Sequence, residues 1–383
     1  MTQEIDIQLL LYRARLLLEE GQSELALPIF SVIQSDNKQT QNQITYLYGW
    51  YYMQVRQWKK ASTTLASLLC ADDAIAPLPQ IERELQAVIL LHLGMVAATM
   101  NLSDDAIDHF TRCLKLLHDR RVHLPQVRIQ AHVWLGKMYL LRASGTLAIQ
   151  HFEEAQRLCH HYQDEQTLPD IYHGLSRAYR ANGVLPQAYQ YAQQALQLYG
   201  QQANVVMEAQ LHLLLGQFSM RDKHSQDAIV HLQTVLHLAG AQHEEVLTVR
   251  AAVLLAELQL AEGHLTEARQ YSQHALQAID TGIGSSLCGL VYYVVGKISV
   301  VEAQQVEGEQ RTLLLEEANR HFEQADGQLK IGQDSADSTD GAPETHLTDL
   351  YTLWGTVLEA LGRPEAALNC WRSGYRLLSG YVS

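Results

Sequence analysis

The chain has 383 residues, of which 47% are apolar, and it carries a formal net charge of −14. Nucleic-acid surfaces depend on clustered Lys and Arg, so this charge argues against direct nucleic-acid binding by the chain. The five cysteines show no CxxC spacing, and their odd number favours reduced thiols in a cytoplasmic protein over a disulfide framework.

The N-terminal residues contain no basic segment followed by an apolar run, so we expect no secretory signal. The most apolar windows, residues 87–100 and 287–301, are too short to span a membrane and contain His92 or Lys297. They are typical of buried helices, and we expect no membrane partner.

Small residues recur along the chain at the middle of predicted helices, at positions that we call anchors. Most anchors are followed twelve residues later by an alanine inside a second predicted helix. Apolar residues repeat at helical spacing around both positions, so each anchor predicts two antiparallel helices joined by a tight turn. From Gly136 to Gly296 the anchors follow each other at an unbroken interval of 40 residues. The nine anchors are Ala14, Gly49, Gly94, Gly136, Ser176, Gly216, Ala256, Gly296 and Gly355. The nine predicted helix pairs lie near residues 5–36, 42–70, 83–118, 127–160, 169–200, 207–239, 247–279, 288–327 and 347–380.

Turn residues agree with this register. Gly21, Gly183, Gly263 and Gly362 each stand seven residues after an anchor, where a left-handed residue would end the first helix. We therefore expect a tight turn of the same kind in each of these pairs.

Three segments depart from the regular spacing, and the first, residues 70–82, lengthens the link between the second and third pairs. Residues 302–311 are inserted into the eighth pair, where we expect them to extend its turn. Residues 332–346 are polar and acidic without apolar periodicity, which predicts a flexible acidic loop. The loop's aspartates are three residues apart, so they do not match the alternating oxygen ligands of an EF-hand calcium site.

The fourth pair carries the most specific motif. Leu135-Gly136 is followed three residues later by Tyr139, and the second helix contains Ala148, Phe152 and Ala155 at spacings of four and three. This pattern resembles the tetratricopeptide repeat (TPR) superfamily. The resemblance implies an all-α fold, in which about nine helix pairs form one right-handed superhelical solenoid over residues 1–383.

A finer resemblance concerns the later pairs. The segments LTEARQYSQHALQ (265–277) and LGRPEAALNCW (361–371), together with the 40-residue interval, resemble the TPR sensor arrays of bacterial transcription regulators that respond to peptides or small effectors. Such arrays bind a short peptide or effector in the concave groove and change their pitch to control an attached domain. The resemblance implies that this chain is a ligand-binding or peptide-binding scaffold.

The resemblance also points to a set of site residues, because first helices line the concave wall of TPR arrays and the residue after the anchor faces the hollow. The middle pairs gather basic side chains at these positions, which would attract a peptide or protein ligand that is acidic or has a free carboxylate. The tryptophans and Tyr293 would supply apolar contacts. The candidate residues are Trp50, His92, Trp134, Lys137, His173, Arg177, Arg180, Gln217, Arg221, Arg250 and Tyr293. The alternative is that these cations pair with acidic neighbours such as Asp170 and Glu257 and bind no ligand.

We find no catalytic motif, no metal-ligand spacing and no cofactor fingerprint in the sequence. The densest histidine cluster, Cys159-His160-His161, has poor geometry for one metal because adjacent helical residues point in different directions. We therefore predict a protein that is not an enzyme and has no cofactor or metal.

Three functions remain open. The chain is predicted to be a sensor that binds a ligand in its groove, or a constitutive scaffold for protein partners. A phosphatase-like regulator is less favoured, because a repeat already occupies residues 7–33, where the related phosphatases carry a catalytic helical bundle. Whether the protein forms a homodimer is also open.

Overall fold

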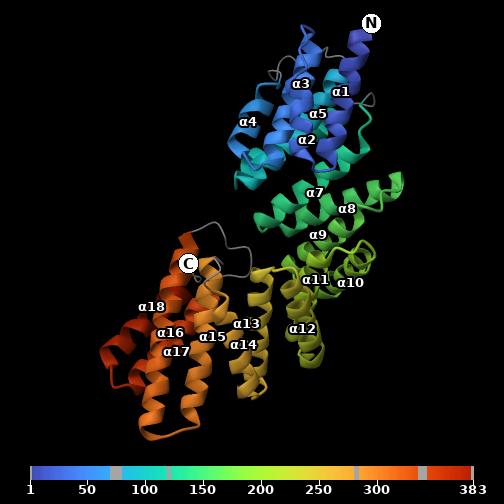
Figure 1. Cartoon of the computed structure of the whole chain (residues 1–383). Coiled ribbons are helices and arrows are strands. Elements are labelled where there is room, and N and C mark those ends of the chain that lie inside the picture. Colours follow the sequence, from blue (N-terminus) through green and yellow to red (C-terminus); the bar gives the residue numbers. More distant parts are fainter. Residues whose placement is uncertain (1, 70–79, 119–121, 280–283, 335–342, 381–383) are drawn as a thin grey trace. The chain divides into compact units, whose positions relative to one another are not determined.

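A computed structural model of the chain describes all residues except 1, 70–79, 119–121, 280–283, 335–342 and 381–383. The described residues form eighteen helices and fall into two compact units, residues 1–191 and 192–383 (Figure 1). The first unit contains α1 (Thr2–Glu19), α2 (Ser23–Ser31), α3 (Lys38–Gln54), α4 (Trp58–Ala66), α5 (Gln80–Thr99), α6 (Ser103–Leu117), α7 (Pro125–Leu141), α8 (Gly145–Tyr162), α9 (Leu168–Ala181) and the start of α10 (Leu185–Gln201). The second contains the rest of α10, α11 (Val205–Arg221), α12 (Ser225–Ala241), α13 (Glu245–Ala261), α14 (Leu265–Gln277), α15 (Ser285–Gln304), α16 (Gly308–Asp334), α17 (Pro343–Ala360) and α18 (Pro364–Gly380).

Consecutive helices pack as the predicted pairs, and the pairs stack on one another. Within the first unit each first helix also contacts the next first helix, from α1 with α3 to α7 with α9. The same holds in the second unit for α11 with α13, α13 with α15, and α15 with α17. The first helices therefore form a continuous layer within each unit, as expected for an all-α repeat fold. That the two units make one solenoid stays a prediction.

The anchors allow a large side chain of the second helix to reach the backbone of the first. Phe152 of α8 is fully buried, and a Cβ atom on the anchor Gly136 would lie 2.7 Å from its ring. On the other side of the ring, a Cβ atom on Gly174 of α9 would lie 2.4 Å away. Phe152 thus fills a space that exists because both neighbouring helices carry glycine there. Related contacts join Gly49 to Leu65, Gly94 to Phe110, Gly216 to Leu232, Gly296 to Phe322 and Gly355 to Trp371.

Ser176 replaces glycine as the anchor of the fifth pair. Its side chain is fully buried, and its hydroxyl donates a hydrogen bond of 2.7 Å to the carbonyl oxygen of Ala188. The hydrogen bond satisfies the one polar group that serine brings into the helix interface.

The expected left-handed turns are confirmed. Gly21, Gly183, Gly263 and Gly362 have φ angles of 75°, 75°, 83° and 75°. The equivalent position in other pairs adopts the same conformation with a side chain, although L-residues disfavour it. Those residues are Arg56, Asn101, Ala143 and Lys223.

The inserted residues of the eighth pair lengthen its helices. We expected residues 302–311 to extend the turn, but α15 continues to Gln304 and α16 begins at Gly308, so that expectation is wrong. The two helices have 20 and 27 residues, and α14 before them has 13. Glu and Gln dominate the insertion, and both are good helix formers, which explains why it extends the helices.

The predicted acidic loop is shorter at both ends than its predicted range of 332–346. α16 continues to Asp334 and α17 begins at Pro343, while residues 335–342 lie outside the described residues. The flexibility of the segment stays a prediction.

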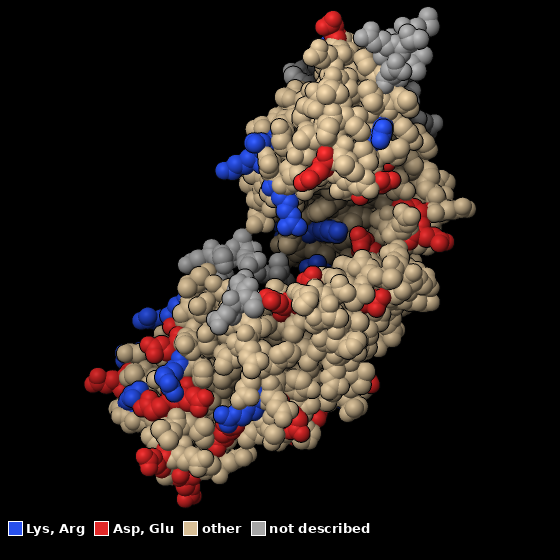
Figure 2. Space-filling model, viewed as in Figure 1, with Lys and Arg blue, Asp and Glu red and all other residues tan. Residues whose placement is uncertain are grey.

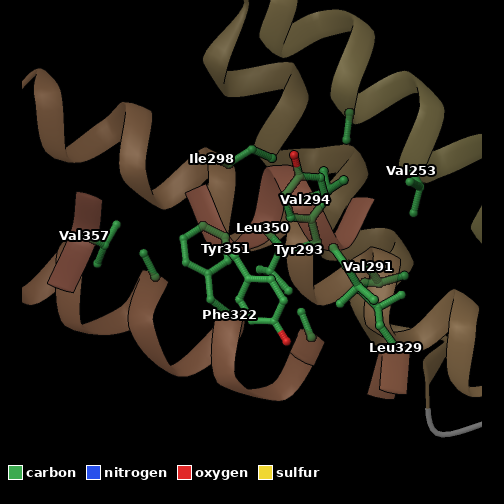
Figure 3. Packing of buried hydrophobic residues seen from close by; sticks show 14 of the residues in the cluster. Val253, Val291, Tyr293, Val294, Ile298, Phe322, Leu329, Leu350, Tyr351 and Val357 are labelled. Atoms are coloured by element: carbon green, nitrogen blue, oxygen red, sulfur yellow. The ribbon is translucent and has the colours of Figure 1, made fainter. Parts of the chain in front are cut away.

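One helix among the described residues, α15, has the length and the mean hydropathy, 1.4, of a segment that can cross a membrane. Half of its apolar window is buried against the rest of the chain. α15 belongs to the largest apolar cluster of the second unit, where Val291, Val294 and Ile298 contact residues of α13, α16 and α17 (Figure 3). It therefore packs as a core helix.

Candidate functional site

The sequence-derived candidates all lie on first helices, but they divide between the two units. In the first unit, Trp50 lies on α3, His92 on α5, Trp134 and Lys137 on α7, and His173, Arg177 and Arg180 on α9. In the second unit, Gln217 and Arg221 lie on α11, Arg250 on α13 and Tyr293 on α15. The residues of each unit are considered separately below.

Lys137 and Trp134 form the centre of the first group. The Lys137 Nζ lies 4.9 Å from the centre of the Trp134 ring, at a distance where a cation is attracted to the face of an indole. The Trp134 ring also stacks on Phe110 of α6, with 6.0 Å between ring centres and an angle of 16°. The buried Phe110 thus orients Trp134, and Trp134 in turn positions the ammonium group.

The α9 side chains place further charges around Lys137. Burial lowers the pKa of Lys137, the nearby Asp170 carboxylate raises it, and the Arg177 guanidinium lowers it. Burial likewise lowers the pKa of Arg177. Burial, followed by the charges of nearby cations, lowers the pKa of His173 to about 4, against the opposing effect of Asp170. The cations are Arg177, Lys137 and Arg180. His173 is therefore neutral at pH 7, and the surrounding charge is dominated by cations.

Two of these cations are partly removed from water. Lys137 and Arg177 are half-buried, and burial lowers the pKa of both, while Asp170 is the carboxylate that acts on Lys137. Half-buried charges lose part of their hydration. An anion bound between them would restore that loss. We call Trp134, Lys137, His173 and Arg177 the basic cluster.

An aromatic cluster occupies the neighbouring first helices α3 and α5. Tyr46 stacks on His92 with 5.6 Å between ring centres, and its hydroxyl lies 3.3 Å from His92 Nδ1. Trp50 lies 5.4 Å from the His92 ring and 6.0 Å from the Tyr46 ring. Burial, followed by the Arg15 charge, lowers the pKa of His92 to about 4, so it is a neutral ring at pH 7. Sequence reasoning had found Trp50 and His92 but missed Tyr46, which stands three residues before its anchor.

The second-unit candidates do not gather into an equivalent basic cluster. Tyr293 is only 3% exposed and lies among the core side chains of α15, α16 and α17 (Figure 3), so we leave it out of the proposed site. Beside it, Lys297 Nζ lies 5.8 Å from the ring centre. Burial raises the pKa of the Glu257 carboxyl, while the charge of Lys297 lowers it. Gln217 and Arg250 are half-buried, and Arg221 is exposed.

The described residues contain no group of three or more His, Cys, Asp or Glu side chains arranged to hold a metal ion. Figure 2 shows one face of the protein, where basic and acidic side chains are scattered over a larger area of other residues. The basic cluster places the positive charges of Lys137 and Arg177 on the neighbouring helices α7 and α9 of the first unit. This arrangement is suited to binding an anion.

No protein-family model and no curated protein sequence matches the chain. Solved structures do match it. The apo form of RapI superposes with a TM-score of 0.69 at 10% identity, over 98% of each chain. The apo quorum sensor NprR from B. thuringiensis has a TM-score of 0.65 at 14% identity, over 98% of this chain and 99% of its own. A signal-transduction ATPase with a tetratricopeptide repeat sensor, PH0952 from Pyrococcus horikoshii, has a TM-score of 0.58 at 14% identity, over 95% of this chain and 54% of its own.

These likenesses extend along almost the whole chain and confirm the fold expected from the motif. The chain is all-α and has the fold of proteins built from tetratricopeptide repeats.

Proposed function

We propose that this chain with a tetratricopeptide-repeat fold is a non-enzymatic binding scaffold, the sensor part of a bacterial regulator, and that its first unit binds a peptide through a carboxylate. The observation that carries the proposal is the pair of half-buried cations, Lys137 and Arg177, whose pKa values are lowered by burial. Trp134 lies beside them as an apolar contact surface. The similar structures support the proposal, because one is a quorum sensor and another has a repeat sensor.

The basic cluster suits a carboxylate for two physical reasons. Charge-assisted hydrogen bonds to Arg or Lys are about twice as strong as neutral ones, and a guanidinium can hold both carboxylate oxygens at once. In addition, the two cations have already lost part of their hydration in the unbound protein, so binding adds less desolvation cost on the protein side. In the aromatic cluster, the half-buried Trp50 and His92 pack against the buried Tyr46 and offer a neutral surface on α3 and α5 for an apolar part of the same ligand.

The test is a binding screen with short peptides that are made with free and with amidated C-termini. Peptides that bind the native chain should include acidic ones or ones that need the free carboxylate. Lys137→Gln combined with Arg177→Gln should weaken their binding about tenfold or more. Lys115→Gln, at an exposed lysine of α6, serves as the matched control and should bind as the native chain does. If the double variant binds the same peptides equally well, the basic cluster is not the site.

A constitutive scaffold for protein partners is the second candidate. It is favoured by one observation, a row of exposed apolar side chains on α18 at helical spacing: Leu368, Trp371, Tyr375 and Leu378. Small-angle scattering of the chain with and without a bound peptide separates the two functions, because a sensor changes its dimensions on binding and a constitutive scaffold does not. A phosphatase-like regulator would instead hydrolyse an aspartyl phosphate, which a phosphate-release assay detects.

Within this proposal the protein acts in the cytoplasm, does not itself bind nucleic acid and needs no cofactor. The reduced state fits four buried cysteines, Cys113, Cys159, Cys288 and Cys370, which form no disulfide with one another. Size-exclusion chromatography with light scattering decides whether the scaffold is a homodimer.

A further inference from the structure

Four helix pairs place two rings opposite each other at the interface between their first and second helices. The positions are equivalent, four residues before the anchor and, apart from the insertion in the eighth pair, fifteen residues after it. The ring pairs are His132 with His151, Tyr172 with Tyr191, His212 with His231, and Tyr292 with His321. Two of the four therefore consist of histidines only, and each residue of the second histidine pair follows its counterpart by 80 residues.

The two histidine pairs have nearly the same geometry. The Nδ1 atoms of His132 and His151 are 3.1 Å apart, and those of His212 and His231 are 2.9 Å apart. The ring centres are 5.3 Å and 5.2 Å apart, with angles of 38° and 42° between the rings. All four side chains are half-buried at the interface between the first and second helices.

The protonation state suits metal binding. Burial first, and then the charge of the partner histidine, lowers the pKa of His132 and of His212 to about 4. Burial also lowers the pKa of His151 and His231. Burial thus favours the neutral form of all four rings, and neutral imidazole is the form that binds transition metals.

We propose that each histidine pair binds one divalent transition-metal ion, such as Zn²⁺ or Ni²⁺, through its two Nδ1 atoms. Two nitrogen ligands of a tetrahedral zinc ion, at about 2.0–2.1 Å from the metal, lie about 3.3–3.4 Å apart. The observed separations of 3.1 Å and 2.9 Å need to open by only a few tenths of an ångström, which a small rotation of half-buried rings supplies. Water molecules complete the coordination.

A carboxylate stands near each pair on the second helix. Glu154 follows His151 by three residues and Asp227 precedes His231 by four, spacings that put each carboxylate on the same helix face as its histidine. Glu154 raises the pKa of His132 and Asp227 raises that of His231, against the larger effect of burial. Glu154 accepts a hydrogen bond of 2.8 Å from Arg157, so it becomes a ligand only when Arg157 releases it. The other groups around the first pair are Arg128, which lowers the pKa of His132, and Tyr139, which stacks on His151.

Metal binding at these places would link the first and second helices of a pair. A ligand that binds only the folded protein stabilises it, so Zn²⁺ should raise the thermal midpoint. α7 carries His132 together with Trp134 and Lys137 of the basic cluster, so the metal would also fix the helix that presents Lys137. This inference is independent of the proposed peptide binding.

The test is a calorimetric titration of the full chain with ZnCl₂ and with NiCl₂ at about pH 7.5, where the histidines are neutral. Two sites per chain are expected. H132Q should leave one site, H212Q should leave one site, and the combination should leave none and should abolish the rise in thermal midpoint caused by Zn²⁺. H160Q, at an exposed histidine of α8, is the matched control and should keep both sites.

If the glutamine variants fold poorly, H132Y with H151Y replaces them, because the fifth pair already contains two tyrosines at the equivalent positions. This variant should fold and bind one ion fewer. Absence of binding to the native chain, or two sites retained in the folded double variants, would overturn the proposal.

Discussion

The ammonium group of Lys137 lies over the indole of Trp134, 4.9 Å from the centre of the ring, on the same helix. The contact gives the cation a favourable neighbour that carries no charge, so its positive charge remains available to a ligand. Lys330 is a useful contrast, because its Nζ lies 2.8 Å from the Asp326 carboxylate and this hydrogen bond raises its pKa. The two lysines should respond differently to the same substitution.

Lys137→Met should leave the thermal midpoint unchanged or raise it, while abolishing binding of carboxylate ligands. Burial already disfavours the charged form of Lys137, and methionine fills a similar space without a charge. Lys330→Met should instead lower the free energy of unfolding by up to about 1 kcal/mol, the usual range for an exposed ion pair. Thermal melts of both variants and a peptide-binding assay check the prediction. A clear loss of stability in Lys137→Met would show that the lysine has a structural role.

Gly136→Ala should destabilise the protein by about 1–3 kcal/mol, the usual cost of overpacking a core. The added methyl group would lie 2.7 Å from Phe152, and that ring cannot retreat because Gly174 closes the other side. Gly327→Ala is the control, because a Cβ atom there has open space inside α16, and it should stabilise the protein by about 0.5–1 kcal/mol through helix propensity. Urea denaturation measures both changes in the free energy of unfolding. If both variants change it by the same amount in the same direction, the packing argument is wrong.

Ala143→Gly should stabilise the protein by about 0.5–1 kcal/mol. Glycine adopts the left-handed conformation without the steric cost that alanine has there, and its larger loss of conformational entropy on folding offsets only part of that gain. Ala143 has a φ angle of 55°, at the position where Gly183 has 75°. Gly183→Ala, where a Cβ atom would meet nothing within 4 Å, should destabilise the protein by a similar amount. The pair of variants isolates backbone strain from packing, and it is measured by the midpoints of chemical unfolding.

The free energy of unfolding should fall as the pH is lowered from about 6.5 to about 4, in part because of His92 and His173. Both have a pKa of about 4 in the folded protein, below the value of about 6.5 in the unfolded chain, so the unfolded chain takes up protons first. Their contribution to stability is complete above about pH 6.5 and is lost as the pH falls through about 4. His92→Gln should make the decline shallower in urea titrations at several pH values. An unchanged pH dependence would mean that His92 is solvated in solution.

The repeat architecture was predictable because the sequence shows the same small residues and turns at regular intervals. The anchors, the left-handed glycines and the pairing of helices follow from residues close in sequence, where spacing alone states the geometry. The insertion at 302–311 was misjudged because the extra residues between the two helices were assigned to the turn, whereas the helix-forming residues of its two ends continue α15 and α16. Helix propensity was the better guide there.

The candidate site was predictable only in part. Counting from the anchors found the first-helix face that carries Lys137 and Arg177, but not whether a side chain there is exposed. Tyr293 illustrates the limit, since its ring lies 6.2 Å from His346 of α17 and is covered by its own unit. The histidine pairs were missed for a related reason: their members are 19 residues apart, and only the helix pairing brings the rings together.

The lengthened eighth pair has a practical consequence. At 1.5 Å per residue, the 27 residues of α16 span about 40 Å, whereas the 13 residues of α14 span about 20 Å. The connection at residues 305–307 therefore lies at the tip of the long α15–α16 pair, and the basic and aromatic clusters lie on helices of the other unit. A fluorescent reporter inserted at this connection would be held by α15 and α16 and would leave those clusters unchanged. It could report ligand-induced movement of this helix pair in living cells.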